Sequence, residues 1–103
     1  MPDRPTLQHT RLSALELKGR PIEITSAELV RTQHWLGDEP AQQEWEVVGR
    51  TYDPTLSDGP QPVVMTVDGR RLKGRVVLTA SRSIGSDLWA FNGVGLGDLV
   101  EVS

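Results

Sequence analysis

An Asp-Gly pair between two runs of β-forming residues constrains this chain more than any other feature. Asp68 and Gly69 separate residues 63–67 from residues 70–80. Asp-Gly flanked by such runs is a strong signal for a β-hairpin with a two-residue turn. This turn sets three opposed pairs, Val67 with Arg70, Met65 with Leu72 and Val63 with Gly74.

The strand alternation sorts the side chains of this hairpin onto two faces, because successive residues of a strand point to opposite sides of the sheet. The face predicted to lie in the core consists of Val63, Met65, Leu72, Val76, Leu78 and Ala80. The opposite face carries Val64, Thr66, Arg71, Lys73, Arg75, Val77 and Thr79. Three cations, Arg71, Lys73 and Arg75, therefore follow one another along one strand. We call this row the basic ridge, and it is the best functional clue in the sequence.

Short strands separated by turns are also predicted along the rest of the chain. Residues 12–17 and 22–24 flank a predicted turn at 18–21, and further strands are expected at residues 44–48, 88–91 and 99–102. Residues 25–36 fit either a helix that begins with a capping box or a strand, and the strand is preferred. The predicted fold class is all-β, a small antiparallel β-sandwich or barrel with at most one short helix.

The length of 103 residues supports one domain with a single modest core. Residues 1–10 are polar and contain two prolines, so we expect a flexible or partner-bound arm ahead of a β-domain over residues 11–103. Residues 53–62 contain three prolines, which predicts the longest internal loop.

Composition argues against several classes of protein. The chain has no cysteine, which excludes disulfides, thiol nucleophiles and cysteine-ligated zinc. No apolar run approaches the ~20 residues of a membrane helix, and residues 1–10 lack the features of a secretory signal, so cytoplasmic synthesis is expected. The net charge of −3 gives no long-range attraction to nucleic acid, which makes a nucleic-acid partner unlikely.

Each motif of a type associated with chemistry has a simpler explanation in this sequence. Gly93, Gly95 and Gly97 suggest a phosphate loop but lack its helix and lysine, and a tight turn or close backbone approach accounts for them. Glu44 and Glu46 share a strand face, whereas paired catalytic carboxylates normally come from different elements around a deep cleft. No catalytic, cofactor-binding or metal-ligating residue is assigned, and we expect the protein not to be an enzyme.

Three tryptophans, Trp35, Trp45 and Trp89, stand against one phenylalanine and one tyrosine. On adjacent strands of a hairpin, Trp35 and Trp45 would face each other. Core or interface packing is the commoner role for tryptophan, but exposed indoles also stack on sugars and bases. An alternative hypothesis is therefore a β-module that binds a glycan or single-stranded nucleic acid through these tryptophans and the basic ridge.

Acidic and basic residues are separated along the chain. Residues 35–58 contain Asp38, Glu39, Glu44, Glu46, Asp53 and Asp58 against Arg50 alone, whereas residues 70–82 contain five cations and no acid. Such surfaces pair either within one chain or between subunits, where charge sets register and specificity more than affinity. We expect a structural subunit that binds copies of itself or other structural proteins, with the basic ridge facing Glu44 and Glu46 of a neighbour.

The C-terminal strands resemble the closing strand pair of tail tube proteins from long-tailed bacteriophages. The similarity lies in Gly-Arg-Val-Val-Leu-Thr at residues 74–79 and Trp-Ala-Phe-Asn-Gly-Val-Gly at residues 89–95. It implies an antiparallel sandwich or barrel that assembles into virion rings without catalysis and uses arms or loops to lock neighbouring subunits. The chain is short for a tube subunit and shows no obvious long hairpin. A head-tail joining or capsid-decorating protein is therefore an alternative within the same class.

Overall fold

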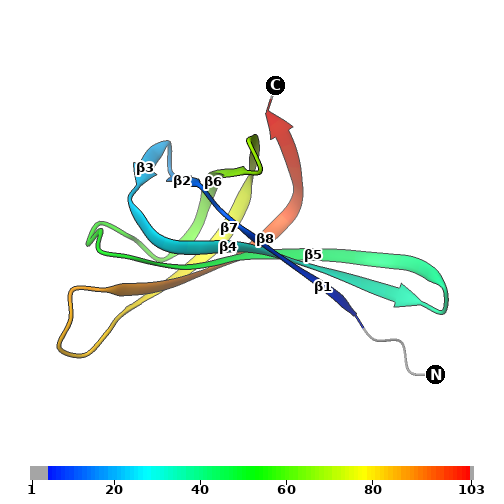
Figure 1. The fold of residues 1–103 in the computed structure, drawn as a ribbon, viewed down its shortest axis with the longest axis horizontal. Helices are drawn as coiled ribbons and strands as arrows, with labels where there is room; N and C mark the ends of the chain where they lie inside the picture. The colour runs from blue at the N-terminus through cyan, green and yellow to red at the C-terminus, as the bar shows by residue number, and fades with distance from the viewer. Residues whose placement is uncertain (1–4, 103) are drawn as a thin grey trace.

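The computed structural model describes residues 5–102, which form eight antiparallel strands in one sheet and contain no helix (Figure 1). The all-β class is therefore confirmed, and residues 25–36 lie in a strand. The strands are β1 (Thr6–Arg11), β2 (Ala14–Leu17), β3 (Arg20–Ile22), β4 (Ile24–Leu36), β5 (Glu39–Thr51), β6 (Gly59–Val67), β7 (Arg70–Arg82) and β8 (Trp89–Val102).

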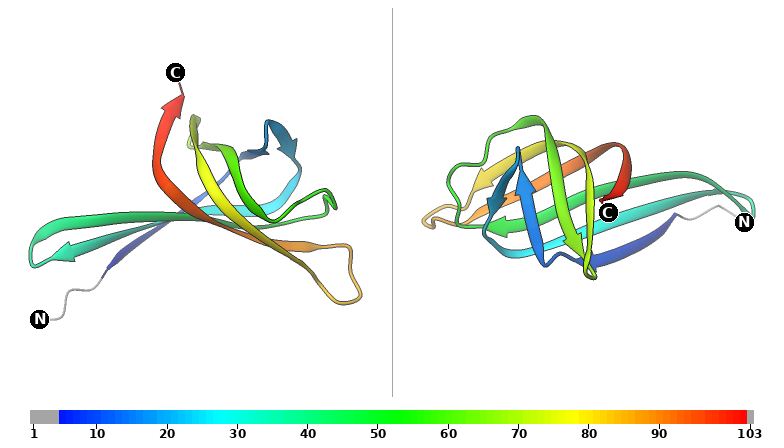
Figure 2. Two further views of the ribbon diagram at one scale, coloured as in Figure 1. Left: turned by 180° about the vertical axis from the view of Figure 1, so that it is seen from behind. Right: turned by 90° about the horizontal axis from the view of Figure 1, so that it is seen from above.

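The sheet curls, and the chain passes directly between the strands at its two ends. Its strand order is β1-β4-β5-β8-β7-β6-β2-β3. β1 leads into β2 and β3 leads into β4, while β1 pairs with β4 and β2 pairs with β3. At the bend, the Leu12 N–H donates to the Ala27 carbonyl at 2.9 Å and the Ser13 N–H donates to the Thr66 carbonyl at 3.0 Å. The strands thus wrap around one core as a small barrel (Figure 2).

Two tight turns set the registers of their hairpins. Asp68 and Gly69 both have positive φ, 51° and 77°, as do Lys18 and Gly19 at 53° and 76°. Positive φ at both central residues is the type I′ geometry that matches the right-handed twist of a hairpin. The three pairs predicted around Asp68 and Gly69 are present. The turn predicted at 18–21 is shorter than expected, because its last two residues already belong to β3.

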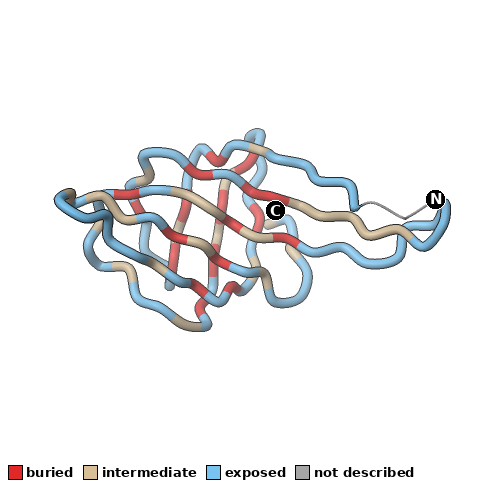
Figure 3. Tube along the Cα trace, turned by 90° about the horizontal axis from the view of Figure 1, so that it is seen from below, coloured by how far each residue is buried: buried red, intermediate tan, exposed pale blue. Residues whose placement is uncertain are grey.

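The hairpin face predicted to lie in the core does so. Five of its six residues are buried and Ala80 is half-buried, while every residue of the basic ridge is exposed. The same core receives side chains from the other strands, among them Leu15, Leu29, Val47 and Phe91. Buried positions recur along the strands of the barrel (Figure 3).

The loop predicted at residues 53–62 is shorter than expected, because β6 begins at Gly59 and includes Pro60 and Pro62. The Lys18 N–H donates to the Pro62 carbonyl at 3.1 Å. Since the N and the carbonyl of one strand residue point to the same side, the missing N–H of Pro62 faces away from β7. The proline therefore costs the β6–β7 ladder no hydrogen bond.

The remaining loop is held by its own polar groups. Thr55 donates its backbone N–H to Oδ1 of Asp53 at 2.9 Å, and its hydroxyl donates to the same oxygen. These hydrogen bonds, assisted by the charge of Arg20, lower the pKa of Asp53 below its ordinary value of 3.8.

Residues 6–10 of the N-terminal segment predicted to be flexible or partner-bound lie in β1 and pair along β4, and the expected partner stays a prediction. Residues 1–4 lie outside the described residues. β1, β4 and β5 extend together beyond the barrel (Figure 1). From here on, the arm means β1 together with residues 31–44 of the β4–β5 hairpin, and no longer the N-terminal segment of residues 1–10 alone. The expectation of no long hairpin was wrong, because β4 and β5 are each 13 residues long and form one.

Candidate assembly surface

The basic ridge lies on the outer face of β7, and the core fixes its direction. Leu72 and Val76 point into the barrel and are 8% and 1% exposed, so the residues alternating with them point outward. Gly74, which also faces inward, leaves room for an indole. A Cβ at Gly74 would lie 2.9 Å from Cζ2 of Trp45.

Charges within the same chain neutralise only part of the ridge. Nη2 of Arg71 lies 3.2 Å from Oε2 of Glu16 on β2. Within residues 5–102, neither Lys73 nor Arg75 forms an ion pair. Pairing inside the chain therefore accounts for Arg71 and leaves two exposed cations for contacts with another molecule.

An apolar strip lies directly beside these two cations. Its members are 37% to 53% exposed and come from β7 and β8: Val77, Val94, Leu96 and Val100. Leu96 is paired across the ladder with Arg75, and Val100 with Lys73. No prediction covered the strip, although the sequence holds the signal. If glycines 93 and 95 face the core, then residues 94 and 96 must face outward.

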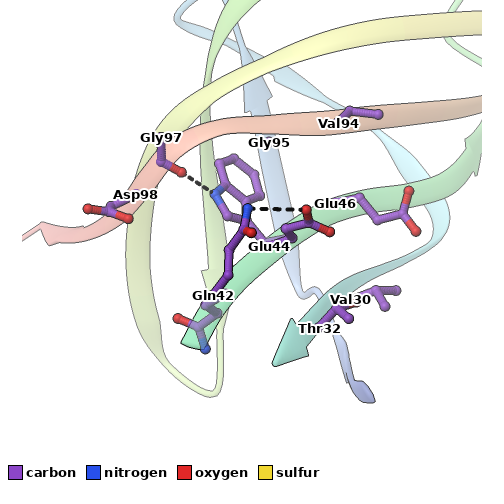
Figure 4. Close-up of a pocket in the computed structure, with 11 residues that line it drawn as sticks. Val30, Thr32, Gln42, Glu44, Glu46, Val94, Gly95, Gly97 and Asp98 are labelled. Atoms are coloured by element: carbon purple, nitrogen blue, oxygen red, sulfur yellow. Dashed lines mark hydrogen bonds between the residues drawn. The ribbon is translucent and has the colours of Figure 1, made fainter. Parts of the chain in front are cut away.

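The glycines of the C-terminal motif serve close packing against Val76 and Trp45 and the geometry of the backbone. A Cβ at Gly93 would lie 3.1 Å from Cβ of Val76, and one at Gly95 would overlap the indole of Trp45. Gly97 has a φ of +71°, and its carbonyl accepts a 2.7 Å hydrogen bond from Nε1 of Trp45 (Figure 4). Close backbone approach and positive φ therefore account for these glycines.

Glu44 and Glu46 lie on β5, on the opposite side of the apolar strip from the ridge. β5 pairs with β8 only from Glu46 to Thr51, so the two strands separate beyond that point. The separation leaves an open hollow of about 520 Å³ whose lining includes the carboxylates of Glu44, Glu46 and Asp98 (Figure 4). Such a hollow favours cationic groups and hydrogen-bond donors.

Both glutamates also have partners in their own chain. Oε2 of Glu44 lies 3.2 Å from Nε2 of His34 on the adjacent strand. Nδ2 of Asn92 donates to Oε2 of Glu46 at 2.9 Å. No lysine or arginine within residues 5–102 is paired with either carboxylate, so both keep their capacity for a cation.

The three tryptophans are not brought together. Trp45 is 7% exposed and stands opposite Arg31, so the prediction that it faces Trp35 was wrong. Trp35 lies in the arm, where its Nε1 donates to Oγ1 of Thr6 at 2.9 Å. Trp89 is half-buried near the other end of the barrel. Because the indole of Trp45 is enclosed, the stacking hypothesis would have to rely on the other two tryptophans separately.

No family model matches this chain, and neither a curated protein nor a solved structure is detectably similar to it. In the part of the chain that the structure describes, no three His, Asp or Glu side chains cluster as metal ligands would. The same part contains no helix long and apolar enough to cross a membrane. The similarity to tail tube proteins stays a hypothesis from the sequence.

Proposed function

We propose that this protein is a non-enzymatic structural subunit that binds other copies of itself. The observation that carries the proposal is the order of three neighbouring strands on the outer surface. β5 presents acids, β8 presents three of the four residues of the apolar strip, and β7 presents the basic ridge. Exposed apolar residues beside cations without a partner in their own chain are typical of a protein-binding surface.

The two kinds of residue have different roles in such a contact. Burial of the strip supplies free energy at about 25 cal/mol per Å² of apolar surface removed from water. Lys73 and Arg75 facing acids such as Glu44 and Glu46 of a neighbour set the register and reject wrong orientations. Like charges brought together by a shifted register would repel.

A narrower form of the proposal places the subunit in the virion of a long-tailed bacteriophage, as a tail or head-tail component. It is supported by the similarity of residues 74–79 and 89–95 to tail tube proteins. It is also supported by the long β4–β5 hairpin, the feature whose absence had counted against that similarity.

Light scattering during size-exclusion chromatography tests the self-association. At low salt and rising protein concentration we expect a mass several times that of the 11.4 kDa chain, falling as salt screens the charge pairs. A mass of one chain under every condition would overturn the proposal.

A charge-reversal variant makes this test specific to the ridge. Lys73→Glu with Arg75→Glu should abolish or strongly weaken association with an unchanged circular dichroism spectrum, because both side chains are exposed. Arg71 is left in place because it pairs with Glu16. Arg50→Glu, an exposed reversal on β5, is the matched control and should associate like the wild type.

A further inference from the structure

We infer that the apolar strip and the free cations of the basic ridge are covered by the arm of a second copy. The inference rests on the proposed self-association and names the segment that makes the contact. The arm has no core of its own, since none of residues 31–44 is buried (Figure 3). A ribbon of a few strands with no covered face gains little from burial, so a long protruding one needs a partner.

None of the segments described covers the arm. Figure 1 shows β4, β5 and β1 pointing away from the barrel. Leu36, next to the turn at the tip of the arm, is 75% exposed, and Leu7 on β1 is 54% exposed. The arm therefore offers apolar side chains, as the strip on the barrel does, and in a single chain its tip points away from the barrel (Figure 1).

The tip of the arm carries negative charge, which is opposite to the positive charge of the ridge. Residues 32–44 of the arm contain three acids, Asp38, Glu39 and Glu44, and no lysine or arginine, whereas the two arginines of the arm, Arg31 and Arg11, lie at its opposite end from the tip. Asp38 and Glu39 at the tip form no ion pair with any residue from 5 to 102. Lys73 and Arg75 on the barrel are likewise without ion pairs. The charges without ion pairs are thus acidic at the tip of the arm and basic on the ridge.

The lengths of the two surfaces agree. At about 3.3 Å per strand residue, residues 39–44 of β5 extend roughly 17 Å from the turn at the tip of the arm. The two free cations and the strip, from Lys73 to Val77 along β7, extend roughly 13 Å by the same rise. One arm laid along β7 and β8 can therefore reach both free cations and the strip.

The arm is expected to bind through a face rather than by adding its edge to another sheet. Residues 39–45 of β5 have no partner strand on the β8 side. This edge strand contains Pro40 and the charged Glu39 and Glu44, features that protect free edges against strand addition. Because arm and ridge are different surfaces, each copy gives one contact and receives one, which builds a reciprocal pair, a ring or a filament.

Two charge-reversal variants and their mixture test the contact. Asp38→Lys with Glu39→Lys reverses the arm tip, and Lys73→Glu with Arg75→Glu reverses the barrel face. Each variant alone should associate at least about tenfold more weakly than the wild type, equivalent to about 1.4 kcal/mol. An equimolar mixture should regain association, because each reversed surface meets its complement. Glu23→Lys, the reversal of an exposed acid between β3 and β4 that forms no ion pair within residues 5–102, is the control for the arm variant.

The outcomes separate the inference from the proposed function. A wild type that is monomeric under all conditions overturns both. If the wild type associates and the arm-tip variant associates equally well, the arm is not the occupant and self-association stands. If both variants fail alone and their mixture also fails, direct pairing between arm and ridge is overturned. The inference is supported if each variant fails to associate by itself, the mixture associates, and circular dichroism shows that both variants are folded.

Discussion

Trp45 shows how one residue shapes the surface that we propose for assembly. Its indole occupies the space left by Gly74 and Gly95, and its Nε1 holds the carbonyl of Gly97 at the point where the β7–β8 register shifts. This register sets Arg75 beside Leu96 and Lys73 beside Val100. A buried side chain and small residues around it thus decide which exposed side chains are neighbours.

Gly95→Ala should be among the most damaging small substitutions in the chain. The new methyl group would overlap the indole of Trp45 and lie 2.6 Å from its carbonyl oxygen. Overpacking of this kind typically costs about 1–3 kcal/mol and sometimes more. We expect a loss in the free energy of unfolding at or above the upper end of this range, measured by urea denaturation.

Gly93→Ala is the control for this prediction, because it lies on the same face of the same strand. The atoms nearest to its methyl group would be those of the Val76 side chain, the first at 3.1 Å. We expect a clearly smaller loss, about 1 kcal/mol or less. Equal losses for the two variants would show that the indole of Trp45 does not limit the space at Gly95.

At the scale of elements, the β4–β5 hairpin has two parts with different environments. Leu29 and Val47 pack in the barrel core, whereas residues 31–44 contain no buried side chain. The first part belongs to the core of the fold, and the second adds contact surface. A change confined to the second part should therefore leave the barrel intact.

Shortening the arm tests this division. If residues 34–42 are replaced by Asn-Gly, Gln33 stays opposite Gln43 and the new hairpin has a type I′ turn. We expect a thermal unfolding midpoint within a few degrees of the wild type, measured by circular dichroism, together with loss of association in light scattering. A barrel that unfolds, or a shortened chain that associates normally, would contradict this division.

At the scale of the whole molecule, stability is concentrated in the barrel and the arm extends from it. The largest extent of the molecule is 46 Å and the smallest is 23 Å, an elongated shape for one small domain. Backbone hydrogen bonds with no apolar cover open more readily than those over a packed core. In the isolated chain, the backbone amides should therefore show two levels of protection against hydrogen exchange.

Hydrogen exchange measured at two protein concentrations can detect both levels. In dilute solution, amides of residues 31–44 should exchange faster than those of β6 and β7, whose inward side chains are buried. At concentrations where the protein associates, protection should rise in the arm and along β7 and β8, whose outward faces carry the ridge and the strip. Protection that rises elsewhere and not in the arm would argue against arm docking.

Much of the fold follows from local rules that a sequence displays. The Asp68-Gly69 turn predicts the β6–β7 register, and the alternation around it predicts the core face and the ridge. The ambiguity of residues 25–36 is local as well, because a capping box and a strand pattern coexist there. Residues 25–36 form a strand because they pair with β1 on one side and with β5 on the other. Prolines 60 and 62 suggested a loop because nothing local shows that their missing N–H groups face away from β7.

The sequence alone determined the all-β class, the central hairpin and the outward direction of Arg71, Lys73 and Arg75, because turn chemistry and the two-residue period of a strand act over a few residues. Only the tertiary structure decided that Arg71 pairs with Glu16, that Trp45 is enclosed, and that β4 and β5 project as an arm. Each of these depends on which distant strands lie side by side. That choice is made by the closure of the sheet around one core, and no local pattern encodes it.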